Sequence, residues 1–316
     1  ILANRAMWLQ QCHVKLPERC LDEEFENPSD NLDTNPNAAD RGWRPFQLAF
    51  VLMNVYAIPT STKAQLEDAE IVDLIWFPTG GGKTEAYLGL AAFSIAYSRL
   101  TKQRSHSGTR VIMRYTLRLL TGQQFNRAST LICALEYLRE FETEFGWDIE
   151  NFRSGGKINI GLWVGQSLTP NTNKNAYQVL KKLRDKNSDQ KNVFQVLNCP
   201  WCKCDLVHHT ISDKQAGKKS YVGYDTKGSS REIIFKCRDA KCPMDELPVI
   251  VVDEQLYNNP PTLLIGTVDK FAQLSWKDEC GRFLGVDADK EPPNLIIQDE
   301  LHLISGPLGS IVAHYE

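Results

Sequence analysis

The sequence lacks the features that would place it in several special classes of protein. No apolar run approaches the roughly 18 residues of a membrane-spanning helix, and no charged-then-apolar segment marks a secretion signal. Glycine and proline, at 20 and 15 of 316 residues, are too few for a collagen-like or low-complexity chain. A net charge of −3 excludes a wholly basic nucleic-acid coat, although it permits a local basic surface. We expect a globular chain of one or two domains, and its start at Ile1 suggests a fragment of a longer protein.

Nine cysteines are present, and five of them gather between residues 199 and 242. Scattered cysteines in a long chain without a secretion signal are typical of a reducing compartment. We therefore expect a cytoplasmic protein, in which a cysteine cluster binds metal rather than forming disulfides.

Two cysteine pairs, 34 residues apart, have spacings that suit a tetrahedral, structural zinc site: Cys199, Cys202, Cys237 and Cys242. Cys204 is a fifth candidate that can replace Cys202, while His208 and His209 rank lower. The alternative interpretation is a set of buried free cysteines.

Short apolar runs alternate with longer segments of helical periodicity. Strands are expected at residues 71–77, 110–115, 157–164, 263–266 and 294–298, and long helices at 83–100 and 117–145. Shorter helices are expected within 1–20 and from residue 44 onward. Alternation of this kind is typical of an α/β fold with a parallel sheet covered by helices.

A polar segment interrupts this alternation and divides the chain. Residues 170–245 contain 15 Lys and Arg against 8 Asp and Glu, so they carry +7 and leave −10 for the rest. We expect an N-terminal segment and acidic linker at 1–43, a first domain part at 44–169, a basic zinc-binding insert at 170–250, and a second domain part at 251–316. The basic insert either holds DNA through its phosphates or presents ordinary solvated lysines, and the charges alone favour neither interpretation.

Residues 77–84, FPTGGGKT, have the pattern of a phosphate-binding loop between a strand and a helix, although the strict pattern has glycine at Phe77. Glycines let backbone N–H groups face phosphate oxygens, and a helix beginning near Lys83 adds its positive dipole end. The Lys83 ammonium would neutralise phosphate charge, and the Thr84 hydroxyl would coordinate Mg²⁺. The alternative is a glycine-rich turn with a chance GKT. The expected ATP-binding residues are Thr79, Gly80, Gly81, Gly82, Lys83, Thr84 and Glu85.

The apolar run at 295–298 leads into Asp299-Glu300-Leu301-His302. A carboxylate at the carboxyl end of a parallel strand lies beside the phosphate loop. Asp299 is expected to hold Mg²⁺, Glu300 to orient and deprotonate the attacking water, and His302 to connect the nucleotide site with a neighbouring element. A solvated acidic pair at a strand end is the alternative.

PTGGGKT followed by a strand-borne DELH resembles motifs I and II of superfamily 2 helicases and translocases. The blocks FPTGGGKTEAYLGL, MRYTLRLLTGQQFNRA and QDELHLISGP are similar to the helicase of the bacterial DISARM anti-phage system. The resemblance extends from about Arg44 to the C-terminus. It implies the first RecA-like P-loop NTPase lobe, an α/β fold interrupted by the zinc-binding insert. It also implies that Gln47, in the Q-like segment RPFQ, contacts adenine. The implied nucleic-acid contacts are Thr116, Arg118, Gln124, Thr267 and Lys270.

For function, the resemblance implies Mg²⁺-dependent ATP hydrolysis that drives movement on DNA, or separation of its strands, in anti-phage defence. The implied partners are DNA that is single-stranded or has a single-stranded end, a second RecA-like lobe that supplies an arginine, and a companion defence subunit. We therefore expect the isolated chain to hydrolyse ATP poorly. Two alternatives are another P-loop ATPase that remodels a complex, and a non-catalytic, zinc-bearing nucleic-acid-binding module. The RPFQ segment and the pair Thr116 and Arg118 argue against the first, and the intact GKT and DELH argue against the second.

Overall fold

The computed structural model describes residues 1–28, 42–59, 67, 70–76, 81–101, 108–116, 118–141, 150–165, 168–185, 188–208, 210–286 and 291–304. Side chains in the helix that starts at residue 118 are described from residue 122 onward.

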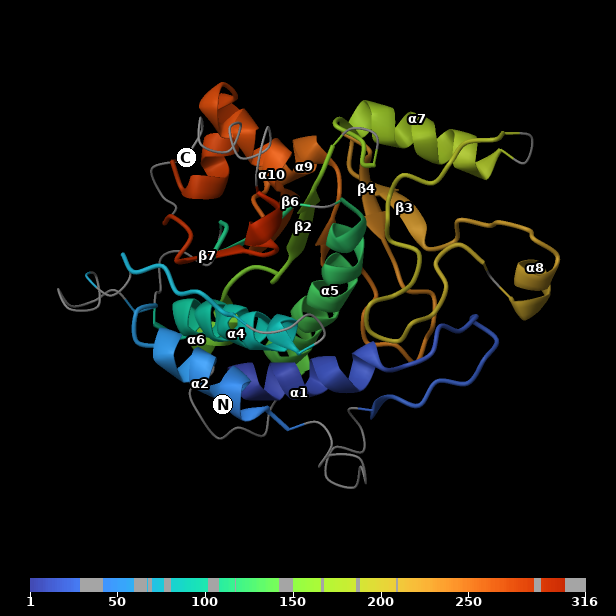
Figure 1. Cartoon of the computed structure of the whole chain (residues 1–316). Helices are drawn as coiled ribbons and strands as arrows, with labels where there is room; N and C mark the ends of the chain where they lie inside the picture. Colours follow the sequence, from blue (N-terminus) through green and yellow to red (C-terminus); the bar gives the residue numbers. More distant parts are fainter. Residues whose placement is uncertain are drawn as a thin grey trace.

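A five-stranded sheet in the order β5–β2–β6–β1–β7 forms the centre of the fold, and its paired strands all run parallel (Figure 1). The strands are β1 (Val111–Tyr115), β2 (Ile160–Trp163), β5 (Val249–Ile250), β6 (Leu263–Thr267) and β7 (Leu295–Gln298). Val111 of β1 pairs with Leu263 on one side and Leu295 on the other. The carboxyl ends of these three strands therefore share one edge, where Asp299 follows β7.

Alternate side chains of the strands face two separate cores, as the pleat requires. Val111 and Met113 of β1 belong to the larger core, whereas Ile112 lies in the smaller one with Trp163 and Phe271. Burial on both faces explains why β1, β2 and β6 read as continuous apolar runs, whereas Ile296 of the edge strand β7 is exposed.

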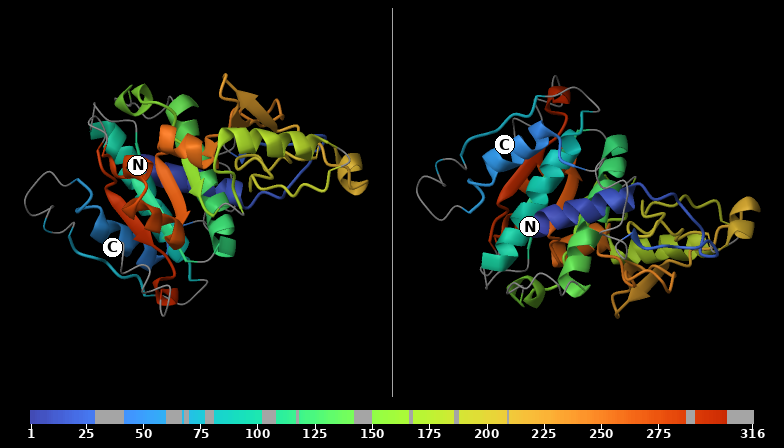
Figure 2. Two further views of the ribbon diagram at one scale, coloured as in Figure 1. Left: turned by 90° about the horizontal axis from the view of Figure 1, so that it is seen from above. Right: turned by 90° about the horizontal axis from the view of Figure 1, so that it is seen from below.

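Helices cover both faces of the sheet (Figures 1 and 2). The larger core lies under α1 (Leu2–Val14), α4 (Lys83–Thr101) and α5 (Arg118–Phe141), with α2 (Pro45–Asn54) and α6 (Glu150–Ser154) packed on α4. The smaller core is covered by α9 (Asp253–Asn258), α10 (Val268–Phe271) and the 3₁₀ helix η4 (Asp278–Leu284). The remaining 3₁₀ helices are η3 (Ala272–Ser275) and η5 (Leu301–Leu303).

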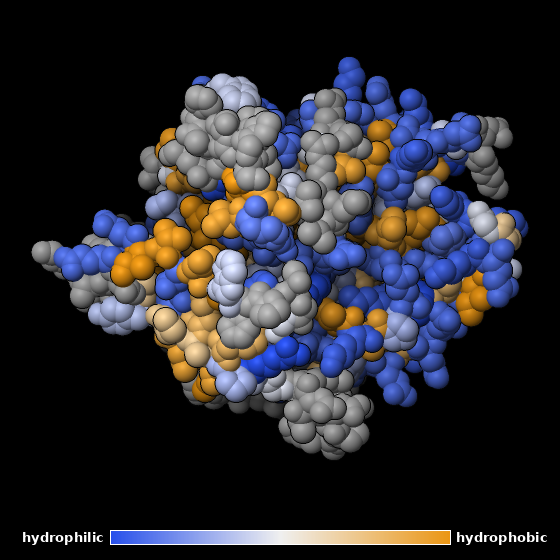
Figure 3. Space-filling model, in the orientation of Figure 1, coloured by the Kyte–Doolittle hydropathy of each residue, from blue (hydrophilic) through white to orange (hydrophobic). Residues whose placement is uncertain are grey.

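Residues 170–248, here called the cysteine module, lie beside one end of the sheet (Figures 1 and 2). They contain α7 (Asn173–Arg184), α8 (Ile211–Gln215) and an antiparallel hairpin of β3 (Tyr224–Lys227) and β4 (Glu232–Phe235). Hydrophilic residues dominate the visible surface on this side (Figure 3). The last two residues of the predicted insert form β5 and pair with β2, which ties the module to the sheet.

The α/β fold with a parallel sheet is confirmed, and four of the five expected strands are present. The strand expected at 71–77 was wrong for its described part, residues 71–76, which pair with no other described strand. Val72 and Trp76 are 92% and 85% exposed. An apolar run alone does not make a strand, because a strand also needs a neighbour to accept its hydrogen bonds.

Among the helices in the described ranges, none combines the length and apolarity needed to cross a membrane.

Candidate nucleotide site and cysteine cluster

A cavity of about 640 Å³ opens at the carboxyl edge of the sheet. Its walls come from α1, the start of α2, the start of α4, one face of α5 and the turn after β7. Seven residues expected in a nucleotide site, from three separate segments, meet here: Gln47, Gly82, Lys83, Thr84, Glu85, Asp299 and Glu300. A concave site that combines a cation, hydroxyls and carboxylates is suited to a phosphorylated ligand.

The amino-terminal end of α4 forms one wall of this cavity. Helix α4 begins at Lys83, directly after Gly82, whose φ of 91° lies in the left-handed region that favours glycine. A Cβ on Gly82 would lie 2.6 Å from Gln47 Nε2, so a side chain here would displace the Gln47 amide. The free N–H groups of the first helical turn favour an anion at this end. Residues 77–80, with the predicted Thr79 and Gly80, lie outside the described residues.

Two side chains of the RPFQ segment donate hydrogen bonds to the backbone of the glycine-rich turn. Arg44 Nη1 donates to the Gly81 carbonyl at 2.7 Å, and Gln47 Nε2 donates to the Gly82 carbonyl at 2.7 Å. Gln47 Oε1 accepts from the Arg44 backbone N–H at 2.9 Å. Both ends of the Gln47 amide are thus engaged with backbone, so an adenine contact would require one of these bonds to be exchanged. That contact stays a prediction.

The opposite wall is the turn that follows β7. The Asp299 backbone N–H donates to the Arg114 carbonyl at 3.0 Å, and the Glu300 N–H donates to Asp299 Oδ1 at 2.9 Å. Glu300 has a φ of 52°, a left-handed conformation that costs a non-glycine residue roughly 1–3 kcal/mol and is found most often at functional sites. His302 Nδ1 lies 3.3 Å from Glu300 Oε2, so the imidazole contacts the carboxylate expected to act as base.

Tyr87 is a residue of this site that the sequence analysis missed. Its hydroxyl donates to Asp299 Oδ2 at 2.7 Å and lies 3.1 Å from Thr84 Oγ1. Burial raises the pKa of Tyr87, so the hydroxyl keeps its proton at neutral pH. The signal was its position one helical turn after Thr84, which places both side chains on the same face of α4.

Glu85 forms an ion pair with Arg127 of α5 at the side of the cavity, which connects the two helices. Gln124, expected to contact nucleic acid, also lines this cavity. Its buried Oε1 has no hydrogen-bond partner among the described residues.

The other expected nucleic-acid contacts lie in different environments. Lys270 is 5% exposed and donates to Asp253 Oδ2 at 2.6 Å, within the core. Thr267 is fully buried, whereas Thr116 is half-buried. The Arg118 side chain lies outside the described residues. A contact from Lys270 to a phosphate would require its buried ion pair to open, so these nucleic-acid roles stay predictions.

The four expected zinc ligands converge on one point. All four Sγ atoms lie within 4.8 Å of one another, with 3.5 Å between Cys202 and Cys237 and 3.9 Å between Cys199 and Cys242. Zn–S bonds of about 2.3 Å in a tetrahedron separate the sulfurs by about 3.8 Å, so the observed spacing fits zinc. It is far longer than the roughly 2.05 Å of a disulfide.

Burial and the neighbouring thiols change the pKa values of the cysteines in this cluster. Burial raises the pKa of Cys199 well above its usual value, whereas hydrogen bonds with the surrounding thiols lower the pKa of Cys202. Cys204 is buried nearby but lies outside the set of four. His208 Nδ1 lies 3.4 Å from Asp205 instead, and His209 lies outside the described residues.

Trp201, between the first two cysteines, packs the cluster against two helices that cover the sheet. Its fully buried ring stacks on His13 of α1 at 3.6 Å and on Tyr137 of α5 at 4.9 Å. His13 Nδ1 donates to the Trp201 carbonyl at 2.9 Å. Burial lowers the pKa of His13 to about 4, so this imidazole is neutral near neutral pH. Thr130 of α5 donates to the Pro200 carbonyl at 3.1 Å.

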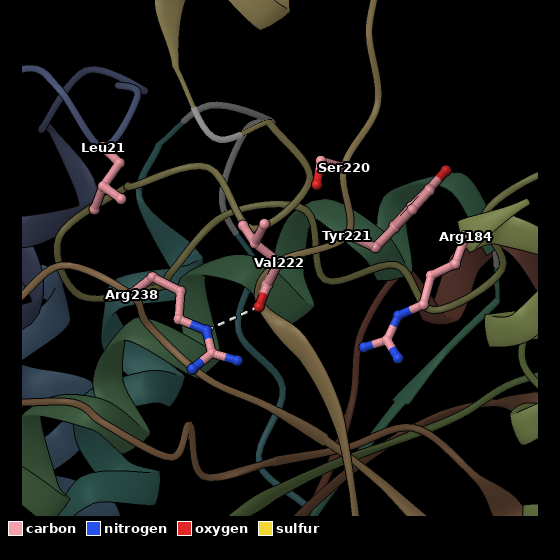
Figure 4. A pocket seen from close by; sticks show the side chains of 6 residues that line it. All are labelled: Leu21, Arg184, Ser220, Tyr221, Val222 and Arg238. Atoms are coloured by element: carbon pink, nitrogen blue, oxygen red, sulfur yellow. Dashed lines mark hydrogen bonds between the residues drawn. The ribbon is translucent and has the colours of Figure 1, made fainter. Parts of the chain in front are cut away.

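A second hollow, of about 610 Å³, lies on the cysteine module (Figure 4). Arg184 and Arg238 line it from opposite sides (Figure 4). Arg184 donates to the Tyr224 carbonyl at 2.6 Å, and Arg238 donates to the Val222 carbonyl at 2.8 Å. Both side chains are exposed, and two anchored guanidinium groups in one hollow suit an anion such as a backbone phosphate.

The fold and these sites define a parallel α/β protein with a phosphate-loop-like cavity at its carboxyl edge and a four-cysteine module beside the sheet. The chain is similar to DISARM protein DrmA of Bacillus paralicheniformis, with 35% identity over 92% of its residues. It spans 28% of the length of that relative. No protein-family model matches the chain.

Proposed function

We propose that this chain is the ATP-binding lobe of a nucleic-acid helicase or translocase that acts on DNA in bacterial anti-phage defence. The observation that supports it is the meeting of Lys83 and Thr84, at the start of α4, with Asp299 and Glu300, after β7, in one cavity. Similarity to DISARM protein DrmA supports the role in defence.

ATP with Mg²⁺ would supply the phosphoanhydride bond that is cleaved. Lys83 would neutralise phosphate charge, while the Thr84 hydroxyl and Asp299 would hold the metal ion. Glu300 would accept a proton from the attacking water. His302, 3.3 Å away, would hold the Glu300 carboxylate in place.

The cysteine module would supply a second grip on DNA. It carries a zinc ion in this proposal, because four buried thiols at tetrahedral spacing suit a closed structural site. The charge of +7 at residues 170–245 and the Arg184–Arg238 hollow would favour a phosphate backbone. The proposed partners are DNA with a single-stranded end, a second RecA-like lobe and a companion defence subunit, all in the cytoplasm.

The test is nucleotide binding and ATP hydrolysis by the full-length protein, with and without single-stranded DNA. We expect DNA to stimulate hydrolysis, Lys83→Ala to abolish nucleotide binding, and Glu300→Gln to bind ATP without hydrolysing it. Lys157→Ala, which removes an exposed lysine outside the cysteine module, is the matched control and should behave as wild type. Hydrolysis that no DNA or RNA stimulates would favour a different P-loop ATPase. Biological activity that survives Lys83→Ala would favour a non-catalytic module.

A further inference from the structure

Tyr87 occupies the space between the two residues proposed to hold the metal ion. Its side chain lies on α4 and the residue is 6% exposed. The hydroxyl is 2.7 Å from Asp299 Oδ2 and 3.1 Å from Thr84 Oγ1, and the Tyr115 hydroxyl lies 3.5 Å away. One phenolic oxygen thus connects α4 to the turn after β7.

The chemistry of the three groups fixes the direction of these bonds. The phenol has a single proton, and the carboxylate is the stronger acceptor at the shorter distance, so Tyr87 donates to Asp299. The phenolic oxygen, to which the Tyr115 hydroxyl donates at 3.5 Å, keeps a second lone pair that accepts the proton of the Thr84 hydroxyl. The result is a relay in which Thr84 donates to Tyr87 and Tyr87 donates to Asp299.

We propose that Tyr87 is a positioning residue for the metal that accompanies the nucleotide, an inference that rests on the proposed ATP-binding function. A hydroxyl that coordinates a cation must turn its proton away from that cation, and the Tyr87 oxygen provides the acceptor. Asp299 is held at both oxygens, by Tyr87 at Oδ2 and by the Glu300 N–H at Oδ1, 2.9 Å away. The relay therefore orients both metal-holding groups before the ion arrives.

Tyr87→Phe tests this inference, because phenylalanine keeps the ring in the core and removes only the hydroxyl. Binding of a fluorescent ADP analogue to the full-length protein is measured while Mg²⁺ is titrated, and again in EDTA. We expect the Mg²⁺ concentration for half-maximal effect to rise about tenfold, as for one lost hydrogen bond to a charged group. Binding in EDTA should stay within about twofold of wild type, because no proposed phosphate contact has changed.

Tyr257→Phe is the matched control. It removes another buried hydroxyl, 3.1 Å from Trp163 Nε1 on the opposite face of the sheet, and should leave the Mg²⁺ requirement unchanged. An unchanged requirement in Tyr87→Phe would overturn the proposal. Equal losses with and without Mg²⁺, or a variant that does not fold, would show a purely structural role and overturn it as well. Wild-type protein that binds no nucleotide would instead refute the proposed function.

Discussion

Cys237→Ser tests the assignment of the four-cysteine site most directly. Cys237 follows β4, and its Sγ lies 3.5 Å from that of Cys202. Serine nearly keeps the volume of the side chain but offers a hydroxyl in place of a soft thiolate, which zinc prefers. We expect the wild-type protein to hold one zinc ion at this site and the variant to lose it.

Loss of the metal ion should strongly destabilise the cysteine module. Zinc-finger peptides gain about 10–16 kcal/mol of apparent binding free energy from their metal, and a whole domain is stable by only about 5–15 kcal/mol. The module shares its core with α1 and α5, and its own sheet is the two-stranded β3–β4 hairpin, a structure that is marginal alone. Its aromatic contacts centre on Phe194, Tyr224 and Phe235, with ring centroids 5.2–6.1 Å apart. We therefore expect the module to unfold locally while the five-stranded sheet persists.

Zinc content by mass spectrometry and unfolding in urea measure the two effects. The variant should show a separate early transition that the wild type lacks, and EDTA should produce the same transition in the wild type. Cys204→Ser is the matched control, because this buried cysteine lies next to the site but outside the set of four. Full zinc content in Cys237→Ser, or loss of zinc in Cys204→Ser, would refute the assignment.

Two further predictions concern the attachment and the charge of the module. Trp201→Ala should lower the free energy of unfolding by about 3–5 kcal/mol in urea titrations, as for other buried aromatic residues, whereas Trp76→Ala, at an 85% exposed position, should change it by less than about 0.5 kcal/mol. A small effect of Trp201→Ala would mean that the stacked rings do not hold the module. The double change Arg184→Ala and Arg238→Ala should weaken DNA binding for all sequences and lower the log–log salt slope by about 0.7–0.9 per lost phosphate contact. The exposed Lys191→Ala, outside the hollow, is its control, and an unchanged slope in the double variant would count against DNA in the hollow.

Most of the sheet could be predicted because its strands are apolar on both faces. The runs at 110–115 and 263–266 became β1 and β6, each buried between two helical layers. The run at 71–77 is also mostly apolar, yet its described residues pair with no described strand. The apolar composition of a segment indicates how much free energy its burial would contribute. Whether the segment forms a strand depends on whether the tertiary fold places another strand beside it.

The residues of the candidate site also differ in how well the sequence alone could place them. Lys83, Thr84, Asp299 and Glu300 could be found from the sequence because each lies in a local motif whose backbone geometry implies its role. Lys270 could not be placed, since its partner Asp253 is 17 residues away and the pair is buried. A charged residue is expected at the surface unless its partner is known.

Helix α1 packs on both α4 and α5. It lies within residues 1–43, for which the sequence predicts an N-terminal segment and an acidic linker. Near its carboxyl end, His13 stacks on Trp201 of the cysteine module, while Trp8 and Gln11, earlier on the helix, line the cavity at the carboxyl edge of the sheet. Removing the cysteine module would therefore expose the faces of α1 and α5 that Trp201 covers, which makes the module part of the core. Helix α1 thus contacts both the cysteine cluster and the cavity at the carboxyl edge, so a change in the packing of the cluster can reach that cavity through this helix.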